Sequence, residues 1–362
     1  MQRLQAIHQP KTLATQQRLW QELDMLCALG LGLAPVAPDV CAVLRAIVGA
    51  DAAALFWLDE VGQPAGFHHE DSPAATQNLF LNEYLRLFHG PGETNILELA
   101  QPGRPRVGQL LSPGARYFRS NSYNLLIRGS GHQHTLDLRV EVDGRTRAVA
   151  ALFLQPGPGF TEDQARTLEQ ASASLARAFR PSSLASHWGS GRRGATGHIV
   201  LDAASQRPVL VDDAATQLLR QANLAGLGMQ EAPGLLPARS LPADLAQRLG
   251  VTADGGSRLP VPHGWLVTTA HPLQPVAGGP GQLMLTLQLE RPCSIDVVRR
   301  VLALPLSPLQ REIALLAGTG HARSECTERT GVGAAALKKH LRVIFEVTGA
   351  TDWETLGALL QR

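Results

Sequence analysis

The sequence predicts a multidomain chain: two α+β units followed by an all-α unit of four helices. Three observations lead to this prediction. The 362 residues exceed the usual length of one domain. Up to about residue 290, stretches with the two-residue alternation of strands are mixed with helical stretches. After residue 305, only helical periodicity, helix caps and glycine stops remain.

Composition limits what the chain can be. Its hydrophobic content of 44% is enough for real cores, and its net charge of +2 means that any nucleic-acid-binding charge must be local. The four cysteines are far apart and show no metal or redox spacing, which favours reduced structural thiols. The first residues, MQRLQAIHQPK, lack the apolar core of a signal peptide, and no apolar run reaches eighteen residues. We therefore expect a cytoplasmic protein with no membrane partner.

The first part of the chain shows helices and then a strand. Apolar side chains at helical spacing predict helices over residues 12–32 and from Pro38 to Val48. The apolar run Ala52 to Leu58 predicts a strand, and the sequence DEVGQP after it is typical of a hairpin turn.

A second hairpin is predicted further along. Thr135 to Val142 alternates apolar and polar residues, an Asp-Gly turn follows, and Ala148 to Leu154 forms the partner strand. Thr161, with Gln164 three residues later, has the spacing of a capping box and predicts a helix that runs to Phe179.

This order of elements, together with the sequence FTEDQARTLEQASASLARAF, resembles the GAF sensor domain over residues 15–180. The unit is assigned to residues 1–180 with its flanking helices. The resemblance implies a small-molecule cavity between the sheet and the long middle segment, and apolar walls with a few polar groups suit such a cavity. The candidate effector-binding residues are Trp57, Phe67, His69, Tyr84, Tyr117, Phe118, Tyr123, His132 and His134.

Other interpretations of these residues stay open. Each can be an ordinary core aromatic or an exposed histidine. The pair His132 and His134 is a metal candidate only with a third ligand, which the sequence does not place, so no metal and no cofactor are predicted beyond an unidentified effector. That effector is expected to be a neutral or weakly acidic aromatic or apolar molecule. A carboxylate on it is expected to meet Arg116, Arg119, Arg128 or Arg139.

The middle of the chain reads as a linker over residues 181–197 and a second unit over residues 198–290. We expect strands at His198 to Ala203, Pro208 to Val211, Leu259 to His271 and Gln282 to Leu289, with helices at DDAATQLLRQA and Leu241 to Leu249. This order resembles a PAS domain. A spacer or dimerisation module without a ligand is the alternative. Residues 291–305 are predicted to form a connecting helix.

The last unit, residues 306–362, has the strongest local signals. Ser307 is an N-cap with Pro308 at the first helical position and Gln310 in the capping-box position. A second helix from Ser324 to Thr330 ends at Gly331, and a third follows from Ala334 to Val347. Two short helices joined by a glycine-containing turn predict a helix-turn-helix.

The third helix is predicted to have two faces. Leu337, Leu341 and Ile344 form the buried seam, and Lys338, Lys339 and Arg342 lie on the opposite arc. A plain solvated face is the alternative interpretation of the paired lysines.

The sequence LSPLQREI, the residues Gly331-Val332, and LKKHLRVIF followed by Thr348-Gly349 resemble the LuxR-type (GerE-like) DNA-binding domain. The resemblance implies a four-helix fold that binds DNA as a dimer. It assigns DNA contacts to Lys338, Lys339, Arg342, His340, Arg323 and Ser324. The chain departs from the family's usual residues at Ala322, Gly333, Cys326 and Ala336, which predicts missing or weaker helix caps and modest intrinsic affinity.

The final segment, TDWETLGALLQR, repeats capping-box spacing at Thr351 and Glu354. It is similar to the family's fourth, dimer-forming helix, which assigns dimerisation to Trp353, Leu356, Leu359 and Leu360. Packing on its own domain is the alternative, and both can hold.

Together these features predict a one-component transcriptional regulator rather than an enzyme. Its expected partners are double-stranded operator DNA with an inverted repeat, a small-molecule effector, RNA polymerase and a second copy of the chain. The sequence contains no nucleophile elbow, zinc motif or phosphate-binding glycine loop. The alternative is a constitutive dimeric DNA-binding protein whose first two units mediate only dimerisation or protein contacts.

Overall fold

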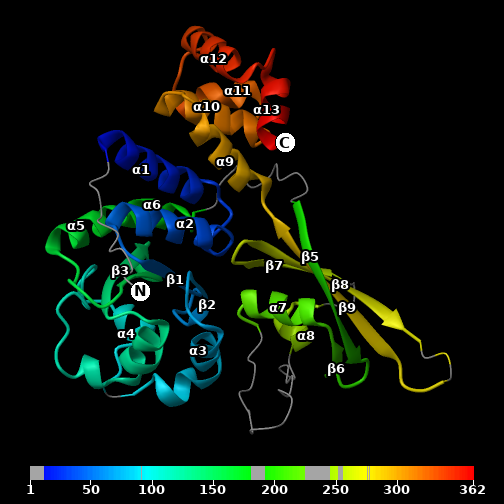
Figure 1. Ribbon diagram of the computed structural model, residues 1–362. Helices are drawn as coiled ribbons and strands as arrows, with labels where there is room; N and C mark the ends of the chain where they lie inside the picture. Colours follow the sequence, from blue (N-terminus) through cyan, green and yellow to red (C-terminus); the bar gives the residue numbers. More distant parts are fainter. Residues whose placement is uncertain are drawn as a thin grey trace, which may run out of the picture.

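The computed structural model describes residues 12–90, 92–180, 192–224, 245–251, 256–274, 276 and 278–362. Among its helices, none combines the length and the apolar character that a bilayer span requires. The chain is multidomain, with two α+β parts that each contain one sheet and an all-α part at the C-terminus (Figure 1).

The first sheet is antiparallel throughout and has the strand order β2-β1-β4-β3. Its strands are β1 (Ala52–Leu58), β2 (Pro64–His69), β3 (His134–Val142) and β4 (Arg145–Leu154). The predicted hairpins are confirmed. Asp143 and Gly144 join β3 to β4 with φ angles of 50° and 75°, a left-handed pair that a two-residue turn requires and that Asp and Gly tolerate.

Helices cover one face of this sheet. α2 (Leu33–Val48), α5 (Glu162–Gln170) and α6 (Ser172–Arg177) lie on the sheet, and α1 (Leu13–Ala28) packs on α2 and α6. The helix predicted from Pro38 begins five residues earlier, at Leu33, because Pro35 falls in the first turn, where no N–H bond is needed. Thr161 and Gln164 form the predicted capping box, but the helix they start is divided at Ala171.

The two faces of the first sheet have different coverings. Leu136, Leu138 and Val140 point to the helices and belong to the main core. Alternate residues, among them Ala151 and Phe153, point the other way, as the two-residue period of a strand requires. That second face is covered by α3 (Ala74–Leu87), α4 (Ile96–Leu99) and the short turns η1 (Tyr117–Arg119), η2 (Ser122–Ile127) and η3 (Arg128–Ser130).

The second sheet has five antiparallel strands in the order β6-β5-β9-β8-β7. They are β5 (Arg192–Asp202), β6 (Pro208–Val211), β7 (Gly256–Val261), β8 (Gly264–Leu273) and β9 (Gln282–Arg291), with α7 (Asp213–Gln221) and α8 (Leu245–Arg248) beside them. The buried residues of α7 and α8 pack with Ile199, Leu285 and Leu287 of the sheet in one core.

Two expectations for this part are corrected. The predicted linker over residues 181–197 is too long, because residues 192–197 already belong to β5; residues 181–191 lie outside the described residues. The predicted strand from Leu259 to His271 is a hairpin that turns at Pro262 and His263. Pro262 cannot donate to a strand ladder, and His263 adopts a φ of 74°, so the strand ends there.

Of the predicted helix Leu241 to Leu249, the described part is α8; residues 241–244 lie outside the described residues.

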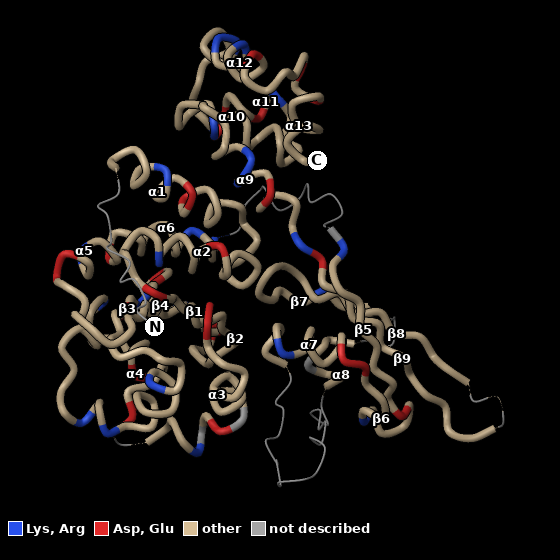
Figure 2. Tube along the Cα trace, viewed as in Figure 1, with Lys and Arg blue, Asp and Glu red and all other residues tan. Residues whose placement is uncertain are grey.

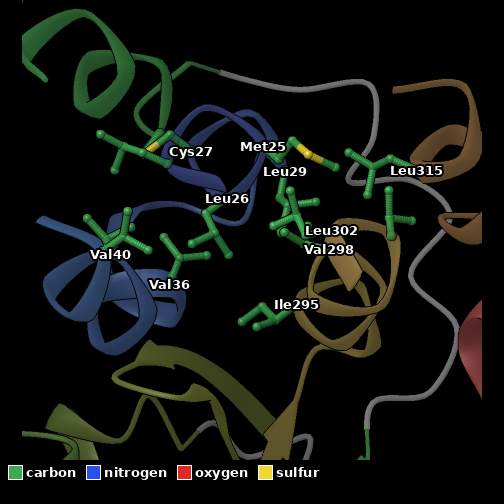
Figure 3. Packing of buried hydrophobic residues seen from close by; sticks show 14 of the residues in the cluster. Met25, Leu26, Cys27, Leu29, Val36, Val40, Ile295, Val298, Leu302 and Leu315 are labelled. Atoms are coloured by element: carbon green, nitrogen blue, oxygen red, sulfur yellow. The ribbon is translucent and has the colours of Figure 1, made fainter. Parts of the chain in front are cut away.

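The C-terminal part contains α9 (Cys293–Ala303), α10 (Pro308–Gly318), α11 (Arg323–Thr330), α12 (Ala334–Thr348) and α13 (Trp353–Gln361). The four helices expected after residue 305 are present. The predicted connecting helix is α9, but it is not a free connection. Met25 of α1 and Leu29, which caps its C-terminus, meet Val298 and Leu302 of α9, and Leu315 of α10 lies beside them in the same buried cluster (Figure 3).

Charged side chains join the same elements. Asp39 of α2 is buried and pairs with the guanidinium of Arg299 on α9, and Arg291, at the end of β9, lies 3.9 Å from the same carboxylate. Only Pro292 separates β9 from α9. The second sheet, the helical layer of the first unit and the C-terminal helices therefore meet at one place.

Candidate functional site

The C-terminal helices are set by local capping chemistry. Ser307 accepts from the Gln310 backbone N–H at 3.4 Å, and the Gln310 side chain accepts from the Ser307 N–H at 2.9 Å. Gly331 ends α11 in the left-handed conformation with a φ of 67°, and α12 begins three residues later. Ala322 and Gly333 give no side-chain cap to α11 and α12, as their residue types predict.

The two predicted faces of α12 are confirmed. Leu337, Leu341 and Ile344 are at most 2% exposed, so this seam fixes the helix against its neighbours. Lys338, Lys339 and Arg342 are exposed on the other side. In Figure 2 the cationic stretch of α12 lies at the end of the molecule furthest from both sheets.

Three predicted DNA-contacting residues line one open groove. Arg323 at the start of α11 contributes to it together with Lys338 and Arg342 of α12. Arg342 Nε lies 3.1 Å from the Glu346 carboxylate, but the two side chains are 83% and 63% exposed, so this pair contributes little stability and is easily exchanged for another anion. The groove also includes Thr351, which sequence reasoning treated only as a helix cap.

The remaining predicted DNA-contacting residues lie around this groove. Lys339 is exposed one helical step away, and Ser324 is exposed in the first turn of α11. His340 is half-buried, because it lies where the exposed arc meets the buried seam.

The predicted dimerisation residues of α13 are mostly internal. Trp353, Leu356 and Leu360 are buried, and α13 packs against α9, α10 and α12. Trp353 Nε1 donates to the His321 carbonyl at 2.7 Å. Leu359 is half-buried. The N-cap is Asp352 rather than Thr351: its carboxylate accepts from the Thr355 N–H at 2.7 Å, which lowers the pKa of Asp352.

A second candidate site lies in the first unit, between its sheet and the segment that includes α3, α4 and η2. This aromatic cavity has a volume of about 80 Å³. The rings of Phe67 and Phe80 in its wall have centroids 4.9 Å apart and nearly perpendicular planes. Its aromatic lining consists of Phe56, Phe67, Phe80, Tyr84, Phe88, Tyr117 and Phe153.

Four of the nine predicted effector-binding residues line the cavity: Phe67, His69, Tyr84 and Tyr117. The other four lining aromatics, Phe56, Phe80, Phe88 and Phe153, were not among those nine candidates. The sequence signal for Phe56 and Phe153 is strand alternation, since each is two residues from an alanine that faces the same side. For Phe80 the signal is the apolar spacing of residues 79–87, which marks α3.

The other five predicted residues do not line the cavity. The Trp57 ring lies over Gly66 on the neighbouring strand, where a Cβ would be 2.6 Å from it. Phe118 is 44% exposed, and the buried Tyr123 packs behind the cavity wall against Tyr117. His132 Nε2 lies 3.1 Å from the Asp71 carboxylate, while His134 Nε2 binds the Gly157 carbonyl at 2.8 Å.

The two histidines that were considered as a metal pair thus have different partners. Among the described residues, no group of three His, Cys, Asp or Glu side chains is arranged to hold a metal ion. None of the four arginines considered for an effector carboxylate lines the cavity either. Arg139 binds the Gln101 carbonyl and Glu141, and Arg128 donates to Asn124.

The sequence matches no protein-family model and no curated protein. Among solved structures, the chain is similar to the chromophore-binding domain of an unusual bacteriophytochrome from R. palustris, at 14% identity and a TM-score of 0.24, over 46% of this chain and 62% of that one. It is also similar to the phycoerythrobilin-bound GAF domain from a cyanobacterial phytochrome, at 10% identity and a TM-score of 0.26, over 47% and 96%. A third match is the E. coli DhaR(N)-DhaL complex, at 16% identity and a TM-score of 0.21, over 77% and 91%. At TM-scores this low, the matches carry no conclusion about what this chain binds.

Proposed function

We propose that this protein is a one-component transcriptional regulator. In this proposal α12 enters the major groove of double-stranded DNA, and a small molecule in the aromatic cavity controls that binding. The observation that carries the proposal is that α12 has one apolar, buried face and one cationic, exposed face. An apolar seam holds the helix, and its three cations are exposed on the other side.

The chemistry of this face suits DNA. Lysine and arginine donate to guanine O6 and N7 and neutralise phosphates. Arg323 adds a fourth cation at the groove that Lys338 and Arg342 share. The nearby acid, Glu346, is exposed and already engages Arg342, so a phosphate can replace it without breaking a buried pair.

The proposal includes a homodimer on an inverted repeat, because one exposed α12 reads one half-site. Trp353, Leu356 and Leu360 are internal to the chain, so α13 offers its outer side chains, such as the half-buried Leu359, to a second copy. Contact with RNA polymerase and a cytoplasmic location belong to the same proposal.

A series of contacts from the cavity to the C-terminal helices supports control of DNA binding by a ligand in the cavity. Phe67 lines the cavity, and its backbone N–H donates to Asn223 Oδ1, beyond the end of α7 in the second unit. From there β9 runs through Pro292 into α9, which packs on α10 and α13. A ligand that favours one of two arrangements of these elements would change DNA affinity by its differential affinity for them.

The alternative is a constitutive DNA-binding protein whose first two units only mediate contacts. The small volume of the aromatic cavity, about 80 Å³, is the observation that favours it.

The DNA-binding part is tested by selecting binding sites from random-sequence duplexes with the full chain. The double variant Lys338→Ala and Lys339→Ala is compared with Arg86→Ala and Arg166→Ala, which removes the same charge from exposed positions on α3 and α5. The first pair should weaken binding to the selected sequence at least about tenfold and reduce its salt dependence. The second pair should leave binding unchanged. Equal enrichment by both variants would count against the proposal.

A further inference from the structure

The aromatic cavity has no fixed charge with which a charged ligand could pair. Among the described residues, those that line it include no Asp, Glu, Lys or Arg; its titratable side chains are His69, Tyr84 and Tyr117, and His69 Nδ1 already lies 3.4 Å from the Asp71 carboxylate. Burying an ion without a partner is very unfavourable, because water is lost and no opposite charge replaces it.

Two further acids that bond to lining residues, Glu93 and Asp137, are already engaged. The Glu93 carboxylate accepts from the backbone N–H groups of Asn121 and Ser122 at 2.8 Å each, and from the Ser122 hydroxyl at 2.7 Å. Asp137 accepts from the Leu110 N–H at 2.7 Å, and burial raises the pKa of its carboxyl. These acids hold the wall together and do not face a ligand.

Two polar atoms of the lining residues are buried without a well-aligned hydrogen bond in the described structure. They are His69 Nδ1, which lies 3.4 Å from the Asp71 carboxylate, and the Tyr84 hydroxyl. Burial raises the pKa of Tyr84 to about 12, which the nearby Leu97 backbone only partly offsets. The hydroxyl therefore keeps its proton at neutral pH and is a donor. An unpaired buried donor is unfavourable unless something accepts from it.

The rings and the volume limit the size of the ligand. The rings contact one another along the wall, with centroid distances of 5.8 Å for Phe56–Phe67, 5.5 Å for Phe56–Phe80 and 5.4 Å for Phe80–Tyr84. Such a wall favours another ring. A cavity of about 150 Å³ holds benzene, so one ring already has to widen this cavity of about 80 Å³, and a fused ring system has to widen it further.

From these observations we infer that the cavity takes a compact, uncharged, single-ring aromatic molecule that carries one hydrogen-bond acceptor, which the Tyr84 hydroxyl contacts. This inference rests on the proposed role of the cavity as the effector site. Its test measures binding of the small molecule in the absence of DNA, so this inference can fail while the proposed DNA binding holds, and the reverse.

The probes are acetophenone, benzoate, benzylammonium and 2-acetonaphthone, titrated into the full chain by calorimetry. Acetophenone should bind at least about a hundredfold more tightly than either ion, because neither ion finds a counter-charge in the cavity. The two-ring ketone should bind more weakly than acetophenone. Benzoate binding as tight as acetophenone, or no acetophenone binding at millimolar concentration, overturns the inference.

Variants locate the binding site. Tyr84→Phe should weaken acetophenone binding about threefold to tenfold, because one hydrogen bond is lost, and should leave toluene binding unchanged. This variant removes an unpaired hydroxyl, so it should fold at least as well as the parent. Arg86→Ala, which changes an exposed side chain of the same helix outside the cavity lining, is the control and should bind acetophenone normally. Equal acetophenone affinity in Tyr84→Phe and the parent would also overturn the inference.

Discussion

Phe67 and Asn223 are 156 residues apart in sequence, and the backbone N–H of Phe67 donates to Asn223 Oδ1 at 2.8 Å. The Phe67 side chain lines the aromatic cavity, whereas Asn223 follows α7 of the second unit. One residue therefore contacts the proposed ligand site with its ring and the next unit with its backbone.

Removing this bond should uncouple the two units. Asn223 has a φ of 59°, so Asn223→Gly removes the side chain without straining the backbone. If the bond transmits the effect of the ligand, the ligand-induced change in DNA affinity should fall by at least about threefold, as measured by fluorescence anisotropy with and without acetophenone. Asn223→Asp keeps an acceptor at the same place and is the matched control. A full ligand effect in Asn223→Gly would show that the signal takes another route.

The pair Asp39 and Arg299 should contribute to stability. Asp39 is 9% exposed and lies between Arg299 and Arg291, so Asp39→Ala removes the buried partner of two half-exposed cations, which keep Asp296 at 3.8 and 3.9 Å. We expect a loss of about 1 to 3 kcal/mol in the free energy of unfolding, measured by urea denaturation. The control is Asp163→Ala on α5, whose carboxylate is 83% exposed and pairs with an exposed arginine. That variant should change stability by less than about 1 kcal/mol, and similar losses in both would refute the prediction.

Acid should weaken the contact between the first two units. His68 of β2 and His263 of the β7–β8 turn have ring centroids 5.7 Å apart. Burial, His263 and His69 lower the pKa of His68 to about 4, and burial also lowers the pKa of His263. The unfolded chain therefore binds more protons than the folded chain between about pH 4 and pH 6.5, so the free energy of unfolding falls as the pH falls through this window.

The expected loss from His68 is on the order of 3 kcal/mol at the low end of the window. It is measured as the difference between the parent and His68→Gln in urea midpoints from pH 4 to pH 7, because carboxylates titrate in both proteins and cancel. Parallel pH profiles for the two proteins would contradict the assignment.

Gly197 should be irreplaceable in the second unit. Helix α7 crosses β5 so closely that a Cβ on Gly197 would lie 2.2 Å from the backbone nitrogen of Ala215. Gly197→Ala should therefore cost about 1 to 3 kcal/mol or more, because backbone has to move. Gly114→Ala is the control, since its Cβ would meet no atom within 4 Å. The midpoints of thermal unfolding of the two variants are compared. Equal midpoints would contradict the prediction, because they would mean that α7 can move away from β5 without loss of stability.

Features that depend on neighbouring residues could be read from the sequence. The capping boxes at Ser307 and Thr161, the turn at Asp143 and the left-handed stop at Gly331 each need only a few adjacent residues, and the structure has all four. The seam of α12 was also readable, because helical period alone sorts Leu337 from Lys338.

Features that depend on distant partners could not be read in this way. The aromatic cavity needs the register of β1 against β2 and β4, which places Phe56 beside Phe67 and on the same face as Ala151. His132 is an apparent ligand in sequence, but Asp71, 61 residues away, holds it. The shared core of α1 and α9 was unpredictable for the same reason, since each helix has an apolar stripe whose partner lies in another unit.

Because of that shared core, the C-terminal helices cannot be separated from the first unit without exposing buried apolar side chains. Val298 and Leu302 face α1, and Val297 of the same helix lies against Gly318 of α10, where a Cβ would come within 2.4 Å of it. Cutting the chain at residue 305 would therefore expose apolar side chains on both fragments. A chimeric protein therefore has to take α9 and α1 from the same parent protein.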